Sequence, residues 1–257
     1  MPHEQYPKLS VMLPTHEPNV FLREAIESVL SQVTPDQIEV VVVDDGSTRT
    51  DVGAMVRSID AQGRVRVVTG PRLGIANNWN RAVSLARGRL VHLLHQDDLV
   101  LPGFYARLTA AFESHPSIGM AFCSSRIVDG TGRWLKTSSR LRWFPGLLDG
   151  WHERIALRQR VQTPSVIVAK TTYDRLGGYR DDLPQTLDWE MWTRIAAAYP
   201  VWYEPRPLAV YRRHEANETS RLLAAGTTWH DIARAIDVIA ESLPPHRRDR
   251  ITRRTAP

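Results

Sequence analysis

Two pairs of adjacent aspartates each follow an apolar run of the chain. Asp44 and Asp45 directly follow one run, and Asp97 and Asp98 follow another after two intervening residues. Adjacent carboxylates repel each other unless a cation or a hydrogen-bond donor neutralises them. Mg²⁺ and Mn²⁺ prefer carboxylate oxygens and often bind substrate phosphates as well. The second pair therefore predicts metal or phosphate chemistry, and the first a carboxylate facing a ribose or base. The alternative for each pair is a simple turn.

A third acidic cluster lies in the second half of the chain. Asp188 and Glu190 open a predicted helix beside Trp189 and Trp192. Partial burial against these rings would raise the pKa of a carboxyl group, as a general base requires. The alternative is capping of the helix start, which these residues alone favour. Further on, residues 212–214 read Arg-Arg-His, which could grip a diphosphate or form a solvated basic edge.

The elements that must position these residues alternate along the first half of the chain. Apolar runs predict strands, and helical spacing of apolar residues predicts helices between them. This alternation predicts an α/β fold with a mainly parallel sheet and right-handed crossovers. We expect strands at 9–13, 38–43, 65–68, 90–94 and 118–123, and helices at 22–30, after Gly74, and at 103–114. Because open α/β sheets bind ligands at the carboxyl ends of their strands, residues 14–16, 44–45 and 95–98 should share one rim.

The second half is less regular. We expect a strand at 166–169, a helix at 188–198, two short strands at 201–203 and 208–211, and a helix at 228–241. Residues 126–160 have weak periodicity. Because no linker-like stretch divides the chain, residues 1–220 should form a single domain, followed by a C-terminal helix and basic tail at 221–257.

Composition excludes several classes of protein. The 257 residues are 42% hydrophobic and 24% charged, as in ordinary globular proteins. The single cysteine, Cys123, excludes an intrachain disulfide and a cysteine-based zinc site. No apolar run reaches the roughly 18 residues of a membrane-spanning helix, and residues 1–8 lack the apolar core of a signal peptide. We expect a cytoplasmic protein, with membrane association left open.

That open question comes from the charge distribution. The formal net charge is +5, and residues 246–257 hold five arginines against one aspartate, 5 − 1 = +4. This segment is either a solvated tail or a contact to an anionic membrane surface, which attracts basic residues by about 1 kcal/mol each. Nucleic-acid binding would depend on this segment alone and is not expected.

Taken together and in this order, the clusters resemble family 2 glycosyltransferases of the GT-A fold. The resemblance runs from about Leu9 to Ser220, most of the chain. No single motif is decisive, but several occur in register. The matching segments are 13–17, 28–32, 42–47, Gly74 with Asn77, Asn78 and Ala82, 97–102, 177–179 with 187–192, and 211–214 with Asn217 and Ser220.

The resemblance implies transfer of a sugar, with inversion, from a UDP- or dTDP-sugar donor to a glycan, lipid-linked or small-molecule acceptor. It also implies a divalent cofactor, Mn²⁺ or Mg²⁺. Asp188 would be the catalytic base, and Trp189 and Glu190 would lie on the acceptor side. Apart from the resemblance, core packing is the default for the tryptophans of the second half, and Trp189 is the one we expect to stack on an acceptor sugar if any does. The implied donor-binding residues are Pro14, Thr15, His16, Asp45, Asn78, Gln96 and Asp97, and the implied metal ligands are Asp97, His95 and His214.

Two positions depart from the family pattern. His95 stands where the first aspartate of the metal motif is expected, which weakens the site or tilts it toward Mn²⁺. Leu187 stands where a glutamate is expected beside Asp188. A catalytically silent GT-A-like binding module therefore remains an alternative. A sugar nucleotidyltransferase is disfavoured because residues 14–18 are neither glycine-rich nor basic, and a dehydrogenase because no Gly-x-Gly-x-x-Gly follows the first strand.

Overall fold

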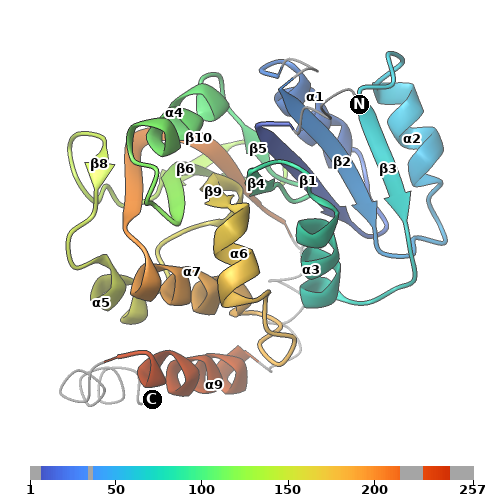
Figure 1. Ribbon diagram of the computed structural model, residues 1–257. Helices are drawn as coiled ribbons and strands as arrows, with labels where there is room; N and C mark the ends of the chain where they lie inside the picture. The colour runs from blue at the N-terminus through green and yellow to red at the C-terminus, as the bar shows by residue number, and fades with distance from the viewer. Residues whose placement is uncertain (1–6, 34–36, 215–227, 244–257) are drawn as a thin grey trace, which may run out of the picture.

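The protein folds around one mixed sheet with helices on both faces (Figure 1). The structure is a computed structural model and describes residues 7–33, 37–214 and 228–243. Within these ranges the sheet has ten strands in the order β3-β2-β1-β4-β9-β6-β10-β5, with β7 paired to β6 and β8 to β10. The predicted α/β fold is confirmed. Asn217, Ser220 and the arginine-rich segment 246–257 lie outside the described residues.

The first four strands run parallel, as the alternating pattern predicts. They are β1 (Leu9–Thr15), β2 (Ile38–Asp44), β3 (Val65–Thr69) and β4 (Leu90–Leu93), connected by α1 (Phe21–Leu30), α2 (Val52–Ile59) and α3 (Ile75–Leu85). Helix α2 was not predicted from the sequence. The pairing register sets Thr15 beside Asp44 and Asp44 beside Thr69. The carboxyl ends of these three strands therefore form one level edge.

Strand β1 continues through Pro14, where the sequence predicts its end. Pro14 pairs in register with Val43 of β2, but β1 pairs with β4 only as far as Met12. Proline is tolerated in a sheet where no neighbour needs its missing N–H. The strand can therefore carry Thr15 to the rim.

The rest of the sheet is mixed. Strands β6 (Met120–Asp129) and β10 (Val201–Arg213) are parallel to each other, and β9 (Val166–Ala169) runs antiparallel between β4 and β6. The short strands β5 (Leu99–Val100), β7 (Trp134–Thr137) and β8 (Gly146–Leu147) pair antiparallel with β10, β6 and β10, respectively.

The two short strands predicted at 201–203 and 208–211 are wrong, because both belong to β10. The pairing of β10 with β6 is irregular between Glu204 and Pro207 and again between Pro207 and Ala209. A proline without an N–H fits such a bulge, so the strand bends there and continues.

The helices form two layers over two buried cores (Figure 1). On one face, α1, α2 and α4 (Phe104–Ser114) cover alternate strand residues such as Val11 and Val40. On the other face, α3, α5 (Trp151–Ala156), α6 (Lys170–Leu176), α7 (Leu187–Ala198) and α9 (Thr228–Glu241) cover the intervening residues, such as Met12 and Val41. Each fully buried aliphatic side chain contributes about 1.5–3 kcal/mol. Helix α9 has the predicted bounds and packs into the same core as α7. Within the described ranges, no helix is both long and apolar enough to cross a bilayer.

Candidate active site

A pocket of about 1060 Å³ lies at the carboxyl ends of β1, β2 and β4, between the first turns of α3 and α7. The structure brings to it ten of the residues singled out from the sequence. They are Pro14, Thr15, His16, Asp45, Asn78, His95, Gln96, Asp97, Asp188 and His214. The aspartates come from the strand-end loops and from a helix on the far side. The pocket thus brings together acidic groups that are far apart in the sequence.

The two aspartates that follow β2 point to different partners. Asp44 accepts hydrogen bonds from the Ser47 backbone N–H (3.1 Å) and hydroxyl (2.6 Å) and closes the local turn. Asp45 lines the pocket and accepts from the backbone N–H groups of Leu73 (2.6 Å) and Gly74 (3.0 Å). These two bonds hold the loop before α3 against the end of β2. One carboxylate of the pair therefore faces the pocket, as strand alternation predicts.

The loops after β1 and β4 are bonded to each other across the pocket floor. The backbone N–H of His16 donates to Gln96 Oε1 (3.0 Å), and Gln96 Nε2 donates to the His16 carbonyl (3.2 Å). His16 Nδ1 lies 3.0 Å from the Asp45 carbonyl. Asn78, from α3, donates to the Val43 carbonyl (3.1 Å). The three strand ends are thus held as one rigid wall.

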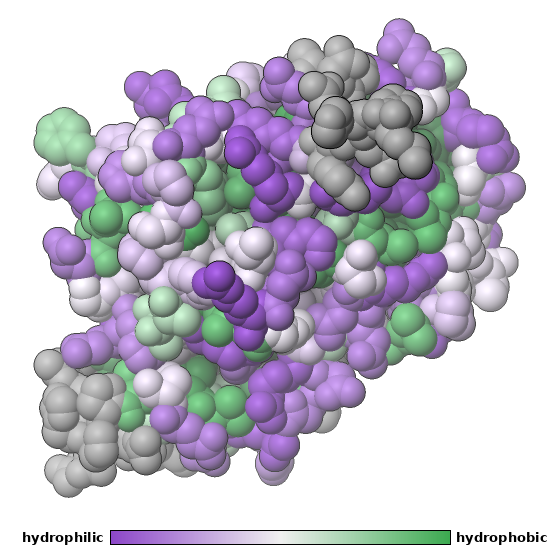
Figure 2. Space-filling model, viewed as in Figure 1, coloured by the Kyte–Doolittle hydropathy of each residue, from purple (hydrophilic) through white to green (hydrophobic). Residues whose placement is uncertain are grey.

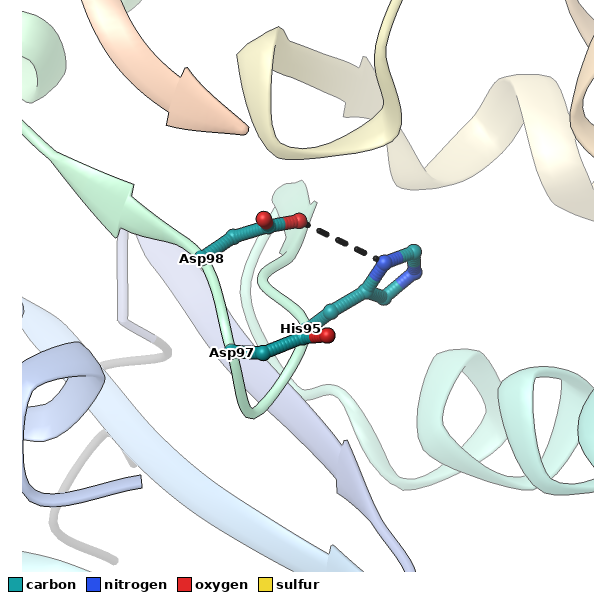
Figure 3. A group of neighbouring side chains, drawn as sticks. All are labelled: His95, Asp97 and Asp98. Carbon is teal, nitrogen blue, oxygen red and sulfur yellow. Dashed lines mark ion pairs between the residues drawn. The ribbon is translucent and has the colours of Figure 1, made fainter. Parts of the chain in front are cut away.

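A cluster of one histidine and two aspartates occupies the loop between β4 and β5. One ligand atom each of His95, Asp97 and Asp98 lies within 4.8 Å of the others. Figure 3 shows the His95 ring turned toward the Asp98 carboxylate, with Nδ1 and Oδ2 3.6 Å apart. Asp98 is 1% exposed, and its burial, together with the charge of Asp97, raises its pKa to about 6. Burial opposes protonation of His95, but the carboxylates nearby outweigh it and raise its pKa.

Strand β10 supports this cluster from behind. The Arg212 backbone N–H donates to Asp98 Oδ1 (2.9 Å), and the Arg212 guanidinium donates to the Asp97 carbonyl (3.0 Å). His214 Nε2 lies 2.9 Å from Asp97 Oδ2. Partners of this kind orient ligands and set their protonation state. The predicted basic cluster at 212–214 therefore acts on the acidic loop, and is more than a solvated edge.

The cluster fits a divalent cation. Asp98 Oδ2 and His95 Nε2 are buried and lack a hydrogen-bond partner among the described residues. Two carboxylates and an imidazole make a donor set suited to a divalent first-row metal. The predicted ligand set was His95, Asp97 and His214. The structure adds buried Asp98 beside His95 and Asp97, and His214, which also lines the pocket, pairs with Asp97.

Asp188 faces the pocket from the first turn of α7. Its Oδ1 accepts from the Trp189 backbone N–H (2.6 Å) and its Oδ2 from the Thr163 hydroxyl (3.1 Å). Burial raises the pKa of Asp188 to about 6, although both hydrogen bonds oppose the shift. No cation forms an ion pair with it among the described residues. A carboxylate with these properties can accept a proton near neutral pH.

Trp189 and Glu190, which we expected on the acceptor side, are both buried. Trp189 is 6% exposed, and its indole N–H donates to the Ile155 carbonyl (2.7 Å) within the core. Glu190 is buried and forms an ion pair with Arg194 (2.7 Å). Successive helical residues are about 100° apart around the axis, and both of these side chains point into the core instead of the pocket.

Other pocket residues were not found from the sequence. They are Arg49, Arg72, Gln159, Gln162, Thr163 and Asp181. Thr163 belongs to the short 3₁₀ turn Thr163–Ser165, and its bond to Asp188 spans 25 residues. No local pattern signals a contact of this range. The two arginines could have been noticed, since both lie close to predicted turns.

Comparison with known proteins agrees with this geometry. Residues 10–175 match the family model described as Glycosyl transferase family 2. The chain belongs to glycosyl transferase family 2. This glycosyltransferase is 30% identical over 252 residues to the Uncharacterized protein MT1568 of Mycobacterium tuberculosis (strain CDC 1551 / Oshkosh). The match covers 93% of this chain and 78% of that protein.

Two more distant similarities concern the same domain. Chondroitin synthase of Escherichia coli is 21% identical over 202 residues, which are 77% of this chain and 28% of that protein. The crystal structure of S. aureus TarS 1–349 in complex with UDP-GlcNAc superposes with a TM-score of 0.77 at 19% identity, covering 95% of this glycosyltransferase and 70% of that chain. The latter similarity establishes the GT-A fold. The chain spans less than a third of the chondroitin synthase.

Proposed function

We propose that this glycosyltransferase moves a sugar from a nucleotide-sugar donor to an acceptor hydroxyl with inversion and with help from a divalent metal. The observation that carries the proposal is one pocket lined both by the His95–Asp97 loop and by the carboxylate of Asp188, which forms no ion pair with any residue that the structure describes. The UDP-GlcNAc bound to the TarS structure supports a UDP-sugar as the donor. A dTDP-sugar is the alternative.

The ends of β1, β2 and β4, together with Asn78 of α3, form one wall of the pocket, which we call the donor wall. It supplies groups for both ends of a nucleotide sugar. Pro14 and His16 would line the base pocket, and Thr15 and Asp45 would face the nucleoside, with Asn78 and Gln96 holding the strand ends around them. Arg49 and Arg72 also line the pocket. Guanidinium groups bind phosphate oxygens strongly, so these two arginines would face the diphosphate.

The acidic loop would hold the metal through Asp97, Asp98 and His95. When bound, such an ion neutralises the diphosphate and stabilises it as a leaving group. An imidazole ligand favours Mn²⁺ over Mg²⁺. His214 would act as a positioning residue that orients Asp97. Because Asp97 lines the donor pocket, the metal and the donor diphosphate would bind together.

Asp188 would be the general base. Its carboxylate takes the proton of the acceptor hydroxyl while the acceptor oxygen bonds to the anomeric carbon. The bond from that carbon to the diphosphate oxygen breaks in the same step, so the configuration inverts and a nucleoside diphosphate leaves. General bases typically contribute 10²–10⁴-fold to the rate. A pKa of about 6 keeps Asp188 ionised at neutral pH while making it more basic than an ordinary aspartate.

The test is a panel of UDP- and dTDP-sugars incubated with the full chain and either Mn²⁺ or Mg²⁺. We expect metal-dependent donor hydrolysis, greater with Mn²⁺, for one donor class. Calorimetric donor binding is measured in parallel. Binding without hydrolysis or transfer under any condition would contradict the proposal and favour a silent binding module, for which His95 and Leu187 are the supporting residues.

A further inference from the structure

We propose that the turn at residues 140–147 docks this protein on an anionic lipid bilayer. The turn lies beside β8, at one end of the molecule (Figure 1). It presents two large aromatic side chains and two arginines to solvent. The proposal concerns a surface outside the candidate active site and stands apart from the proposed function.

The aromatic side chains on this turn are unusually exposed. Trp143 and Phe144 are each 76% exposed, and Leu147 beside them is 36% exposed. Soluble proteins bury most large aromatic side chains, so an adjacent exposed pair marks an interaction site. Figure 2 shows hydrophobic surface at the corner that β8 occupies, next to hydrophilic side chains. Tryptophan and phenylalanine side chains readily enter the interfacial region of a bilayer.

The turn holds these side chains in a fixed position. Arg142 Nη1 donates to the Leu147 carbonyl (2.5 Å) and closes the turn across its base. Gly146, with φ of +154°, allows this approach, because a Cβ there would lie 2.6 Å from Arg142 Nη1. The segment is therefore pre-organised, and docking would not require it to fold first.

The charges around the aromatic pair favour an anionic partner. The Arg140 guanidinium lies over the Trp143 ring, 4.5 Å from its centroid. Neither Arg140 nor Arg142 forms an ion pair with any described carboxylate. Lys136 nearby is exposed as well, and Asp149 is the only acid between residues 136 and 149. Arginine beside tryptophan matches a lipid surface that carries negative headgroups.

The turn pairs with the other end of β10 from the end that lines the pocket. Gly146 pairs with Tyr203 on β10, whereas Tyr211 on the same strand lines the pocket. Eight residues of strand separate Tyr203 from Tyr211, which is roughly 25 Å.

The test is co-sedimentation of the full chain with vesicles of phosphatidylcholine containing about one-third phosphatidylglycerol, against vesicles of phosphatidylcholine alone. We expect binding to the anionic vesicles only. The double variant Trp143→Ser/Phe144→Ser should bind at least about tenfold more weakly, because it loses both interfacial side chains. Trp229→Ser is the matched control, since Trp229 on α9 is also 76% exposed, and it should bind like the wild type.

Two results would overturn the proposal. One is unchanged vesicle binding by the double variant, which would assign any membrane contact to the C-terminal arginines alone. The other is a wild-type dimer in light scattering that becomes a monomer in the double variant, which would make the turn a protein interface. Donor hydrolysis in free solution should be the same in wild type and double variant, so failure of the proposed function would be seen separately.

Discussion

The two walls of the pocket are built in different ways. The donor wall joins three strand ends through hydrogen bonds such as those from Leu73 and Gly74 to Asp45 and those between His16 and Gln96. The opposite wall presents Asp188 from one helix, with hydrogen bonds from the Trp189 N–H and the Thr163 hydroxyl. The first wall is a fixed binding surface. The second presents one reactive group whose basicity comes from burial.

Their electrostatics differ in the same way. In the donor wall, backbone N–H groups donate to Asp45, and His214 lies beside Asp97. Asp188 has only neutral donors, the Trp189 N–H, the Thr163 hydroxyl and the Gln159 side chain, and no ion pair among the described residues. Asp98 resembles Asp188, because burial raises the pKa of each to about 6. The contrast therefore concerns Asp45 and Asp97, whose charges have close partners where a nucleotide would bind, and Asp188, whose basicity is raised where a proton would be taken. This contrast leads to five predictions.

The largest effect should come from Asp188→Asn. The amide cannot accept the acceptor proton, so transfer should fall by about 10²–10⁴-fold. Donor affinity should stay within error, because the donor wall is untouched. An assay of the transfer rate measures the first effect, and calorimetry measures the donor affinity. Asp181→Asn, an exposed carboxylate lining the same pocket, is the matched control and should keep its activity. Full transfer by Asp188→Asn would remove the proposed base.

His214→Gln should lower the affinity for the metal but leave donor binding in place. Loss of a residue that orients a metal ligand typically costs about 10–100-fold in metal affinity. The measurement is transfer rate as a function of Mn²⁺ concentration, in which the half-saturating concentration rises and the plateau changes less. His152→Gln, at the far end of α5, should leave the curve unchanged. An equal loss at every Mn²⁺ concentration would argue against a positioning role.

Asp45→Asn should lower the stability of the donor wall. The variant has one side-chain oxygen for two backbone donors, so the N–H of Leu73 or Gly74 loses its partner, at a cost of about 1–3 kcal/mol. Urea unfolding measures this change. Asp188→Asn should move the other way at pH 8, because it removes a buried charge that opposes folding. If both variants destabilise alike, the contrast between the walls is wrong.

The pH dependence of transfer should follow Asp188. Burial raises its folded-state pKa to about 6, so the reactive carboxylate is ionised above pH 6 and is lost as the pH falls below it. Transfer should therefore fall about tenfold from pH 7 to pH 5, one unit below this pKa. Saturating Mn²⁺ should keep Asp98 ionised during the titration. Rates that stay level down to pH 5 would place the catalytic proton on another group.

The donor wall was predictable because its chemistry follows strands. A buried strand ends at a rim, so Thr15, Asp45 and Asp97 could be placed together before any contact was known. The direction in which a strand pairs was harder to predict from the sequence than its position. The strand at 166–169 is correct, but no local pattern indicates that β9 runs antiparallel between β4 and β6. The prolines of β10 also look like breaks, although a bulge accommodates them.

The second wall was harder to predict because its contacts are long-range. Asp188 could be named, but its support by Thr163 depends on how α7 lies against a turn 25 residues earlier. The pocket-facing side of α7 is set by the same packing. Proximity in sequence therefore misplaced Trp189, whose ring lies in the core. The separation of neighbouring residues around a helix leads to the last and smallest predicted effect.

Trp189→Phe should leave the acceptor KM unchanged. The phenyl ring keeps most of the buried apolar contact, and the variant loses the indole hydrogen bond to the Ile155 carbonyl, which costs about 1 kcal/mol of stability. Acceptor saturation curves and urea unfolding separate the two effects. A weaker acceptor affinity at unchanged stability would mean that the ring reaches the sugar after all, through a rotation of α7 that would also turn Asp188 out of the pocket. Burial of the Trp189 ring in the core, with its indole N–H bonded to the Ile155 carbonyl, is what keeps it away from the acceptor.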